Sequence, residues 1–543
     1  MDTEVKRSEL KTLQKPQVFV NSITFMDDTV HKFTHSSIVV FTGSNNCGKS
    51  QVLRDIELRI KDSNSPSVVV SELTTDFVGE VDDDFVFSKF KLGDDGNYWL
   101  GGNCGYPENW KAQWNNHSLY TLFTLFVNRL DTEERLIASK TKPLYSGSPH
   151  EQRNSLHTIY ESNAIEDTIS KLFYEAFGEA LVVNRRAGIN VSLQVGKRPS
   201  WEGQRDGEGE YYDSVRALPL LDKQGDGMRS FSSILLDTFT SEHSVTLIDE
   251  PEAFLHPPQA RILGKMLAKN NPCERQLFIA THSADFINGL LDADNSNVIV
   301  IRINRDGNTN HMNTLGNDKI KELWSNPLLR YSNILNGLFH EKVVVCESDY
   351  DCLFYRAILD AIFESDGKTA PDIMFTQCGG KDRMKDVVAA LNALKVPVVA
   401  IPDFDIVDDS AKLKSLSLAF GINWNNVSDN MNKVYACINA ENGKIRSMIK
   451  KNGFSVFTGE APAAFNAVDS FFRSAGLFIV PVGDIESFDK TINKDKKEWV
   501  YAILERGNLN SESNLETARK FVKSIVNYKP SLIDELAIAL GVS

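Results

Sequence analysis

A glycine-containing stretch at residues 43–50, GSNNCGKS, has the residue types and spacing of a phosphate-binding loop. It follows an apolar β-type run and precedes a helical run, which is the order that such a loop requires. Backbone N–H groups at the helix N-terminus can then surround a phosphate, Lys49 can reach the β- and γ-phosphates, and the Ser50 hydroxyl can bind Mg²⁺. We therefore predict an ATP and Mg²⁺ site. Its residues are Asn45, Asn46, Gly48, Lys49 and Ser50.

Two adjacent acids provide the carboxylates that nucleotide hydrolysis needs beside such a loop. Asp249 and Glu250 follow the apolar run at 245–248, where a buried parallel strand would deliver them to the edge of a sheet. Asp249 can hold a hydrated Mg²⁺ and Glu250 can polarise an attacking water, the two functions that nucleotide hydrolysis needs. Acids also follow apolar runs at ordinary strand-to-loop junctions. Only the loop at 43–50 favours the catalytic interpretation.

Two further features flank the acid pair along the chain. The stretch GDGMRSF at 225–231 is a glycine turn at the start of a helix, and His282 lies at the end of a second strand-like run. With the acid pair, these features resemble ATP-binding cassette and SMC-type ATPases. The resemblance implies that His282 is a switch residue, although a lone histidine is more often structural.

The same resemblance implies that the glycine turn acts on the nucleotide of a second protomer, through Gly227 and Ser230. At least a homodimer would then be needed to complete each site. Asp226 stands where these families usually place a serine near the γ-phosphate. An acid there repels the γ-phosphate, which bears on the rate of hydrolysis more than on nucleotide binding.

A second set of acids occurs downstream, at the ends of separate strand-like runs. Glu347 ends one run, Asp351 follows one helical turn later, and Asp403 and Asp405 flank Phe404 after another. Alternation along an extended segment would place Asp403 and Asp405 on one side, where they can share divalent cations. Glu486, with Asp484 beside it, would add ligands. Any one acid alone would be a solvated strand end, but together they suit two-metal phosphodiester hydrolysis.

The order of a glutamate after one strand, GGK at 379–381 after the next, and DxD at 403–405 after the third resembles a Toprim domain. An SMC-like ATPase followed directly by a Toprim domain resembles the overcoming lysogenization defect (OLD) family of ATP-dependent nucleases. This resemblance implies a DNA endonuclease that uses Mg²⁺ or Mn²⁺. The implied metal ligands are Glu347, Asp351, Asp403, Asp405 and Glu486.

The OLD family also uses a lysine downstream of these acids, for which Lys520 and Lys523 are the candidates, with Lys520 preferred. Such nucleases occur in bacterial anti-phage systems, alone, beside a helicase-like protein, or beside a reverse transcriptase with its DNA/RNA product. The sequence leaves the partner open. It also leaves open two other functions: an ATP-switched DNA-binding or scaffold protein that does not cut, and an enzyme that consumes nucleotides.

The predicted fold is α/β, with an ABC/SMC-type P-loop ATPase followed by a C-terminal Toprim domain. We place the N-terminal ATPase lobe at 1–115 and a helical insertion at 116–184, for which a dimerisation arm, a nucleic-acid contact and internal core are the alternatives. The C-terminal lobe follows at 185–335 and the Toprim domain at 336–543, with its own helical insertion at 408–472. A basic cluster at Arg185, Arg186, Lys197 and Arg198 is interpreted as solvated surface.

The bulk composition excludes several classes of protein. The net charge of -14 argues against coating nucleic acid nonspecifically, because that mode requires a basic surface. The 7 cysteines include no CxxC pair, so neither zinc nor a disulfide framework is predicted. No apolar run is long enough to cross a membrane, and the polar N-terminus lacks the apolar core of a secretory signal. We therefore expect a cytoplasmic protein.

Overall fold

The computed structural model describes residues 15–100, 102–200, 209–307, 309–315, 333–440 and 444–529. The chain divides into two units, residues 1–317 and 318–543, which are described separately. The sequence pattern also favours helices at 319–340 and 532–540, but most of the first and all of the second lie outside the described residues. No helix in the described ranges is long and apolar enough to span a membrane.

The first unit is organised around a six-stranded sheet of order β15-β14-β3-β13-β12-β8. All neighbours pair in parallel except β14 and β15. Parallel strands end at one edge, so the segments that follow β3, β12 and β13 meet there. The strands are β3 (Ile38–Gly43), β8 (Val127–Leu130), β12 (Val245–Asp249), β13 (Gln276–Ala280), β14 (Val298–Asp306) and β15 (Thr309–Leu315).

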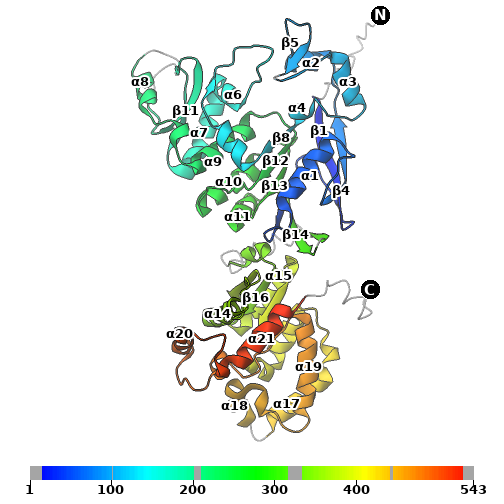
Figure 1. Ribbon diagram of the computed structural model, residues 1–543, viewed down its shortest axis with the longest axis vertical. Coiled ribbons are helices and arrows are strands. Elements are labelled where there is room, and N and C mark those ends of the chain that lie inside the picture. The colour runs from blue at the N-terminus through cyan, green and yellow to red at the C-terminus, as the bar shows by residue number, and fades with distance from the viewer. Residues whose placement is uncertain are drawn as a thin grey trace, which may run out of the picture. The chain divides into compact units, whose positions relative to one another are not determined.

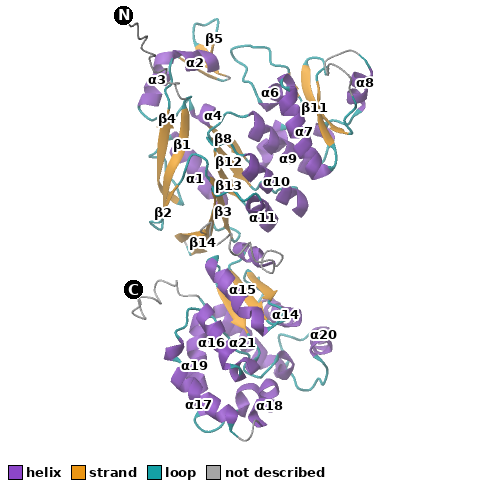
Figure 2. Cartoon of the chain, turned by 180° about the vertical axis from the view of Figure 1, so that it is seen from behind, coloured by secondary structure: helices purple, strands orange, loops and turns teal. Residues whose placement is uncertain are grey.

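Helices cover both faces of this sheet, as Figures 1 and 2 show, with α1 on one side of β12 and β13 and the pair α10 and α11 on the other. Every residue of β3 is buried, as expected for a strand between two helical layers. The helices of the unit are α1 (Lys49–Lys61), α2 (Asp83–Lys89), α3 (Pro107–Asn115), α4 (Phe123–Phe126), α5 (Thr132–Ala138), α6 (Ser155–Glu161), α7 (Asn163–Phe177), α8 (Glu210–Ala217), α9 (Asp226–Thr240), α10 (Pro257–Asn270) and α11 (Ala284–Asp292).

An antiparallel sheet of order β2-β1-β4 packs against α1. Asp55 of α1 is fully buried, and its Oδ2 accepts hydrogen bonds from the backbone N–H groups of Val68, Val69 and Val70 at 2.6–3.1 Å. This carboxylate therefore fixes α1 to the start of β4. The strands are β1 (Gln17–Phe25), β2 (Val30–Lys32) and β4 (Val70–Val78).

The segment at 116–184, predicted as a helical insertion, is more mixed than expected. It contains α5, α6 and α7, but it also supplies β8, the edge strand of the main sheet beside β12. Two small antiparallel sheets complete the unit, of order β5-β6-β7 and β10-β11-β9. Their strands are β5 (Lys91–Leu92), β6 (Tyr98–Leu100), β7 (Asn103–Gly105), β9 (Lys142–Pro143), β10 (Ala180–Asn184) and β11 (Asn190–Gly196).

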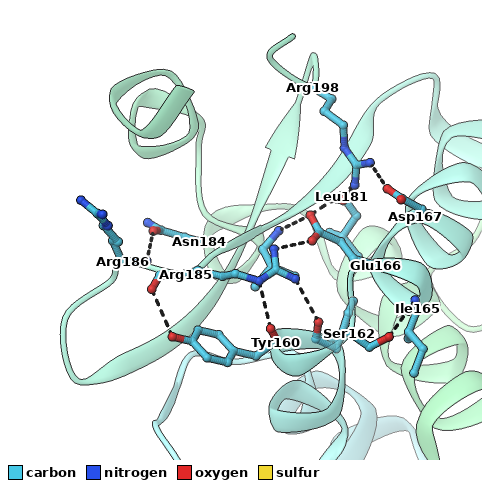
Figure 3. Close-up of polar contacts among 12 residues, drawn as sticks. Tyr160, Ser162, Ile165, Glu166, Asp167, Leu181, Asn184, Arg185, Arg186 and Arg198 are labelled. Carbon is cyan, nitrogen blue, oxygen red and sulfur yellow. Dashed lines mark hydrogen bonds and ion pairs between the residues drawn. The ribbon is translucent and has the colours of Figure 1, made fainter. Parts of the chain in front are cut away.

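A buried carboxylate joins α7 to the β10–β11 hairpin, as Figure 3 shows. Glu166 has no exposed surface, and it pairs with Arg185 at 2.6 Å and with Arg198 at 3.2 Å. Its Oε1 also accepts a hydrogen bond from the backbone N–H of Val183. The interpretation of Arg185 and Arg198 as solvated surface is therefore wrong, because both guanidinium groups neutralise a buried acid.

Replacing Glu166 with alanine is expected to lower the free energy of unfolding of the first unit by about 3–5 kcal/mol, because two largely buried guanidinium groups lose the buried carboxylate that pairs with both of them. Urea denaturation would measure this loss. The matched control is Asp167→Ala, which removes a 48% exposed partner of Arg198 and should cost less than about 1 kcal/mol. Equal losses in the two variants would contradict a structural role for the buried pair.

The second unit contains a parallel sheet of order β17-β16-β18. Alternate residues of β16 face opposite layers: Val344 packs in the core formed with α14, whereas Val343 lies near Leu391 of α15. The apolar stretch at 477–486, whose pattern favours a strand, is reduced to a single parallel bridge between Ala400 and Leu477, and its end enters the 3₁₀ helix η7 (Ile485–Phe488). The strands are β16 (Lys342–Cys346), β17 (Ile373–Gln377) and β18 (Val398–Ile401).

Helices surround this small sheet and form most of the second unit. Four of them, α16 to α19, fall in or next to the predicted helical insertion, whereas the sequence pattern did not predict α20 (Figure 2). The helices are α14 (Asp349–Ser365), α15 (Lys381–Ala393), α16 (Ser410–Ala419), α17 (Ser428–Asn439), α18 (Lys444–Asn452), α19 (Ala461–Ala475), α20 (Lys496–Arg506) and α21 (Glu516–Asn527), with short 3₁₀ helices η3 (Phe404–Asp408) and η7 (Ile485–Phe488).

Candidate functional site

The phosphate-binding loop connects β3 to α1. Gly43 and Gly48 have φ angles of 148° and 101°, and a Cβ at Gly43 would lie 2.3 Å from the Ile303 carbonyl oxygen. These positions therefore require glycine. The Lys49 Nζ donates to the carbonyl oxygens of Gly43 and Ser44 at 3.0 and 2.9 Å, so its ammonium lies over the loop. Asn45 and Asn46 are exposed at the tip of the loop.

The loop and the acid pair meet through one hydrogen bond. The Ser50 hydroxyl donates to Asp249 Oδ1 at 2.9 Å, which joins the start of α1 to the end of β12. Burial raises the pKa of Asp249, and the neighbouring charge of Glu250 adds to this effect, whereas the Ser50 hydrogen bond opposes it. A hydroxyl beside a partly buried carboxylate is a donor set that suits Mg²⁺.

Glu250 and His282 face each other across the ends of β12 and β13. The Glu250 backbone has a φ of 48°, and its N–H donates to the Ala280 carbonyl oxygen at 2.8 Å. His282 Nδ1 lies 3.3 Å from Glu250 Oε1 and also 3.3 Å from Glu252 Oε1. Both Glu250 and His282 are half-exposed, so they are accessible to a nucleotide and to water.

Glu252 is a buried acid that fixes the histidine loop. Its Oε1 accepts hydrogen bonds from the Thr281 hydroxyl at 2.8 Å and from the His282 backbone N–H at 2.9 Å. Burial raises the pKa of Glu252, and these hydrogen bonds and His282 oppose that effect. The sequence analysis missed this residue, although an acid two positions after the acid pair in a continuous motif was a visible signal.

The glycine turn forms the start of α9, with Gly225 as the N-cap. A Cβ at Gly227 would lie 2.6 Å from the Phe254 carbonyl oxygen, so the turn packs closely against the segment after the acid pair. The charge of Asp226 is partly balanced by Arg229 at 2.8 Å. Ser230 is fully buried, and its Oγ accepts from Arg135 Nε at 2.9 Å. The expectation that Ser230 reaches the nucleotide of a second protomer is therefore corrected: its hydroxyl faces inward.

The downstream acids come together at the C-terminal end of the second sheet. Glu347 directly follows β16, and its Oε1 accepts the Asp403 backbone N–H at 3.1 Å. Asp351 lies in the first turn of α14, where its Oδ2 accepts from the N–H and hydroxyl of Ser348 at 2.9 and 2.8 Å. Asp403 caps η3, and Asp405 lies within it. The chain therefore turns into a helix here, which corrects the expectation of an extended segment.

Two lysines balance the charge of these acids. Lys496 at the start of α20 lies 2.8 Å from Asp351 and 3.8 Å from Asp403, and Lys381 lies 2.9 Å from Asp405. Burial raises the pKa of Asp403 well above its usual range, and so do the nearby carboxylates, whereas Lys496 opposes the rise. Burial also raises the pKa of Glu347. Burial alone would lower the pKa of Lys496, but Asp403 and Asp351 together raise it.

A cavity of about 490 Å³ opens over this cluster. Its acidic lining residues are Glu347, Asp349, Asp403, Asp484 and Glu486, and its lysines are Lys450 and Lys496. Within the described ranges no three His, Cys, Asp or Glu side chains already converge on one point. However, Asp405 Oδ1 and Glu486 Oε2 are buried without a hydrogen-bond partner. Such unsatisfied carboxylate oxygens fit a hard divalent cation.

Two sequence models of protein families match the chain. The model described as "Overcoming lysogenization defect protein-like, TOPRIM domain" matches residues 338–405, from β16 to Asp405. The AAA_21 model, described as "AAA domain, putative AbiEii toxin, Type IV TA system", matches residues 192–288, which include the acid pair and His282. Taken together, the two matches support an OLD-family ATPase–Toprim fusion. These two domains imply the use of a nucleotide and of a divalent metal in general terms.

Solved structures that match the chain include SMC head domains and an ATP-binding cassette, all at low sequence identity. An SmcHead bound to the C-winged helix domain of ScpA is 12% identical, covering 56% of this chain and 99% of that chain, with a TM-score of 0.34. An Smc head domain from Pyrococcus furiosus is 10% identical, covering 57% and 99%, with a TM-score of 0.36. A nucleotide-free ATP-binding cassette from an ABC transporter is 11% identical, covering 58% and 98%, with a TM-score of 0.27. No curated protein matches the chain in sequence.

Lys520, which the OLD-family resemblance led us to expect at the acid site, contacts none of the described acids of that site. Lys520 is on the exposed face of α21, where its 74% exposed side chain pairs with Glu516 at 2.6 Å. Lys523 is also exposed. Lys496 contacts Asp351 and lies upstream of both candidates, as does Lys381, which contacts Asp405. The sequence could not single out Lys496, because DKK at 495–497 reads as an ordinary charged turn.

Proposed function

We propose that the chain is an ATP-regulated, divalent-metal-dependent DNA endonuclease. The observation that carries the proposal is the set of carboxylates at one end of the Toprim sheet, around one cavity, with Lys496 among them. Acids brought together from β16, η3 and η7 are costly unless a cation compensates them. A metal-binding nuclease site would explain why the fold tolerates the unfavourable free energy of clustered carboxylates.

Glu347, Asp403 and Glu486 line the cavity and would hold divalent ions, and Asp351 and Asp405 would support them. A bound divalent ion of this kind lowers the pKa of water and stabilises a leaving phosphate oxygen. Lys496 would neutralise phosphate charge beside the acids, and Lys450 would contact the DNA backbone at the rim. Carboxylate oxygens suit both Mg²⁺ and Mn²⁺.

The ATPase unit would regulate this activity. Lys49 and Ser50 would bind the phosphates and Mg²⁺ of ATP, Asp249 would hold the ion, and Glu250 with His282 would orient an attacking water. We propose that Gly227 contacts the nucleotide of a second copy of the chain. Phe254 lies beside that glycine and is 52% exposed, which supports an interface there.

By the family resemblance we also propose a role in bacterial anti-phage defence in the cytoplasm, with DNA and a second copy of the chain as partners. Nothing in the described residues points to a reverse transcriptase or a helicase-like partner. The proposal is therefore limited to a homodimer that acts on DNA.

Incubating purified protein with supercoiled plasmid and Mg²⁺ or Mn²⁺, with and without ATP, tests the proposal. We expect nicked or linear product, no product in EDTA, and no product from Glu347→Ala, because the acid site would lose a ligand. Gel electrophoresis measures the products. ATP-dependent DNA binding without cleavage would favour the scaffold function instead, and depletion of ATP without nicking would favour an enzyme acting on nucleotides.

A further inference from the structure

Arg135 in α5 is a fully buried arginine that makes contacts unlike those of a structural ion pair. Within the described part of the chain, its hydrogen bonds go to backbone carbonyls and hydroxyls, and none goes to a carboxylate. Burying a permanent charge in this way is costly. Nearby acids, including Glu252 and Asp249, offset part of that cost by their field. The guanidinium lies between two functional segments, and this position explains why the fold keeps a buried charge here.

One side of the guanidinium holds the backbone of the acid pair. Its Nη1 donates to the Asp249 carbonyl oxygen at 2.6 Å, and its Nη2 donates to the Glu250 carbonyl oxygen at 2.9 Å. Glu250 has a φ of 48°, a conformation that a glutamate rarely adopts without such support. Arg135 therefore fixes the turn that aims Glu250 and holds Asp249 against Ser50.

The other side of Arg135 holds the helix that begins at the glycine turn. Its Nε donates to Ser230 Oγ at 2.9 Å, and its backbone carbonyl accepts from the Ser233 hydroxyl. Both serines are buried in the first two turns of α9. One rigid, planar guanidinium thus bonds to α9 and to the acid-pair turn at the same time, which a lysine cannot reproduce.

We infer that Arg135 is a positioning residue that couples the glycine-turn helix α9 to the acid pair Asp249–Glu250. This inference rests on the proposed function, in which the glycine turn docks on the nucleotide of a second protomer. A shift of α9 on docking would pass through Arg135 to the turn that carries Glu250. Hydrolysis would then occur only in protomers whose glycine turn is engaged, which would link ATP turnover to dimer formation.

The experiment compares variants that lose equivalent buried bonds in different places. Arg135→Lys keeps the charge but loses the planar fork, and Ser230→Ala removes only the contact with α9. Arg275→Lys is the matched control, because Arg275 is also buried and donates to the carbonyl oxygens of Thr238, Ser241 and His243 at the opposite end of α9. ATP affinity is measured by calorimetry, ATP-induced dimers by analytical ultracentrifugation, and turnover by phosphate release.

We expect Arg135→Lys to lower kcat about 10- to 100-fold, and Ser230→Ala to lower it in the same direction, while ATP affinity and dimer formation stay within about twofold. Arg275→Lys should keep the kcat of its folded fraction. Normal kcat in both Arg135→Lys and Ser230→Ala, or equal losses of kcat in Arg135→Lys and Arg275→Lys, would overturn the coupling. Absence of ATP hydrolysis or of ATP-induced dimers in the unaltered protein would instead refute the proposed function on which the coupling rests.

Discussion

Replacing Lys496 with alanine is expected to reduce DNA cleavage by roughly 100- to 1,000-fold, the effect of removing one charge-stabilising group from a reacting phosphate. Lys496 contacts Asp351 at 2.8 Å and lines the cavity beside Glu347 and Asp403. In this position its ammonium can neutralise both the acids and an approaching phosphodiester. Initial rates of plasmid nicking at saturating Mg²⁺ or Mn²⁺ would measure the change.

Lys520→Ala is the matched control for this prediction, because Lys520 is exposed and pairs only with Glu516 among the described contacts. It should cut DNA at a rate within about twofold of the unaltered protein, as expected for an exposed i,i+4 pair. Lys496→Arg should recover part of the lost activity, since the charge is kept while the geometry changes. Loss of cleavage in Lys520→Ala with full activity in Lys496→Ala would reverse this assignment.

Replacing Lys49 with alanine is expected to weaken ATP binding by roughly 100-fold, because charge-assisted bonds to two phosphates are lost. The Lys49 ammonium is held over the loop by the carbonyl oxygens of Gly43 and Ser44, and phosphate oxygens would replace them with little rearrangement. Isothermal titration calorimetry with ATP and Mg²⁺ would measure the affinity.

Lys61→Ala is a matched control for Lys49→Ala, because Lys61 lies on the same helix but pairs with Glu57 at the far end. Its ATP affinity should stay within about twofold of the unaltered protein. Thermal unfolding of Lys49→Ala without nucleotide should be nearly unchanged, since among the described residues Lys49 donates hydrogen bonds only to loop carbonyls. Unaltered ATP affinity in Lys49→Ala would contradict the assignment of the loop at 43–50.

The local motifs could be predicted because each depends on a few adjacent residues. Three motifs can be recognised from residues that lie close together in the sequence: a glycine loop between a strand and a helix, an acid pair after an apolar run, and acids after successive strands. The order of the ATPase and Toprim parts follows from the order of these motifs, and the two family models confirm it. Pattern alone is less reliable for a whole element: the apolar stretch at 477–486 has the pattern of a strand but forms a single bridge.

The residues that the sequence did not identify are those placed by distant parts of the chain. Arg135 and Ser230 meet across 95 positions, and Lys496 reaches Asp351 from a different helix, so no local spacing marks either pair. Burial also decided whether the predicted roles of Ser230 and Lys520 fit the structure. Both residues occur in amphipathic helices, but Ser230 faces inward and Lys520 faces solvent.

The sequence by itself therefore determined which chemical groups this protein has and in what order: the phosphate loop, the acid pair, and the later carboxylates. The tertiary structure decided which lysine joins the carboxylates and which serine is withdrawn from the surface. The physical reason is that a motif depends on covalent spacing, whereas burial and charge pairing depend on which segments the fold brings together.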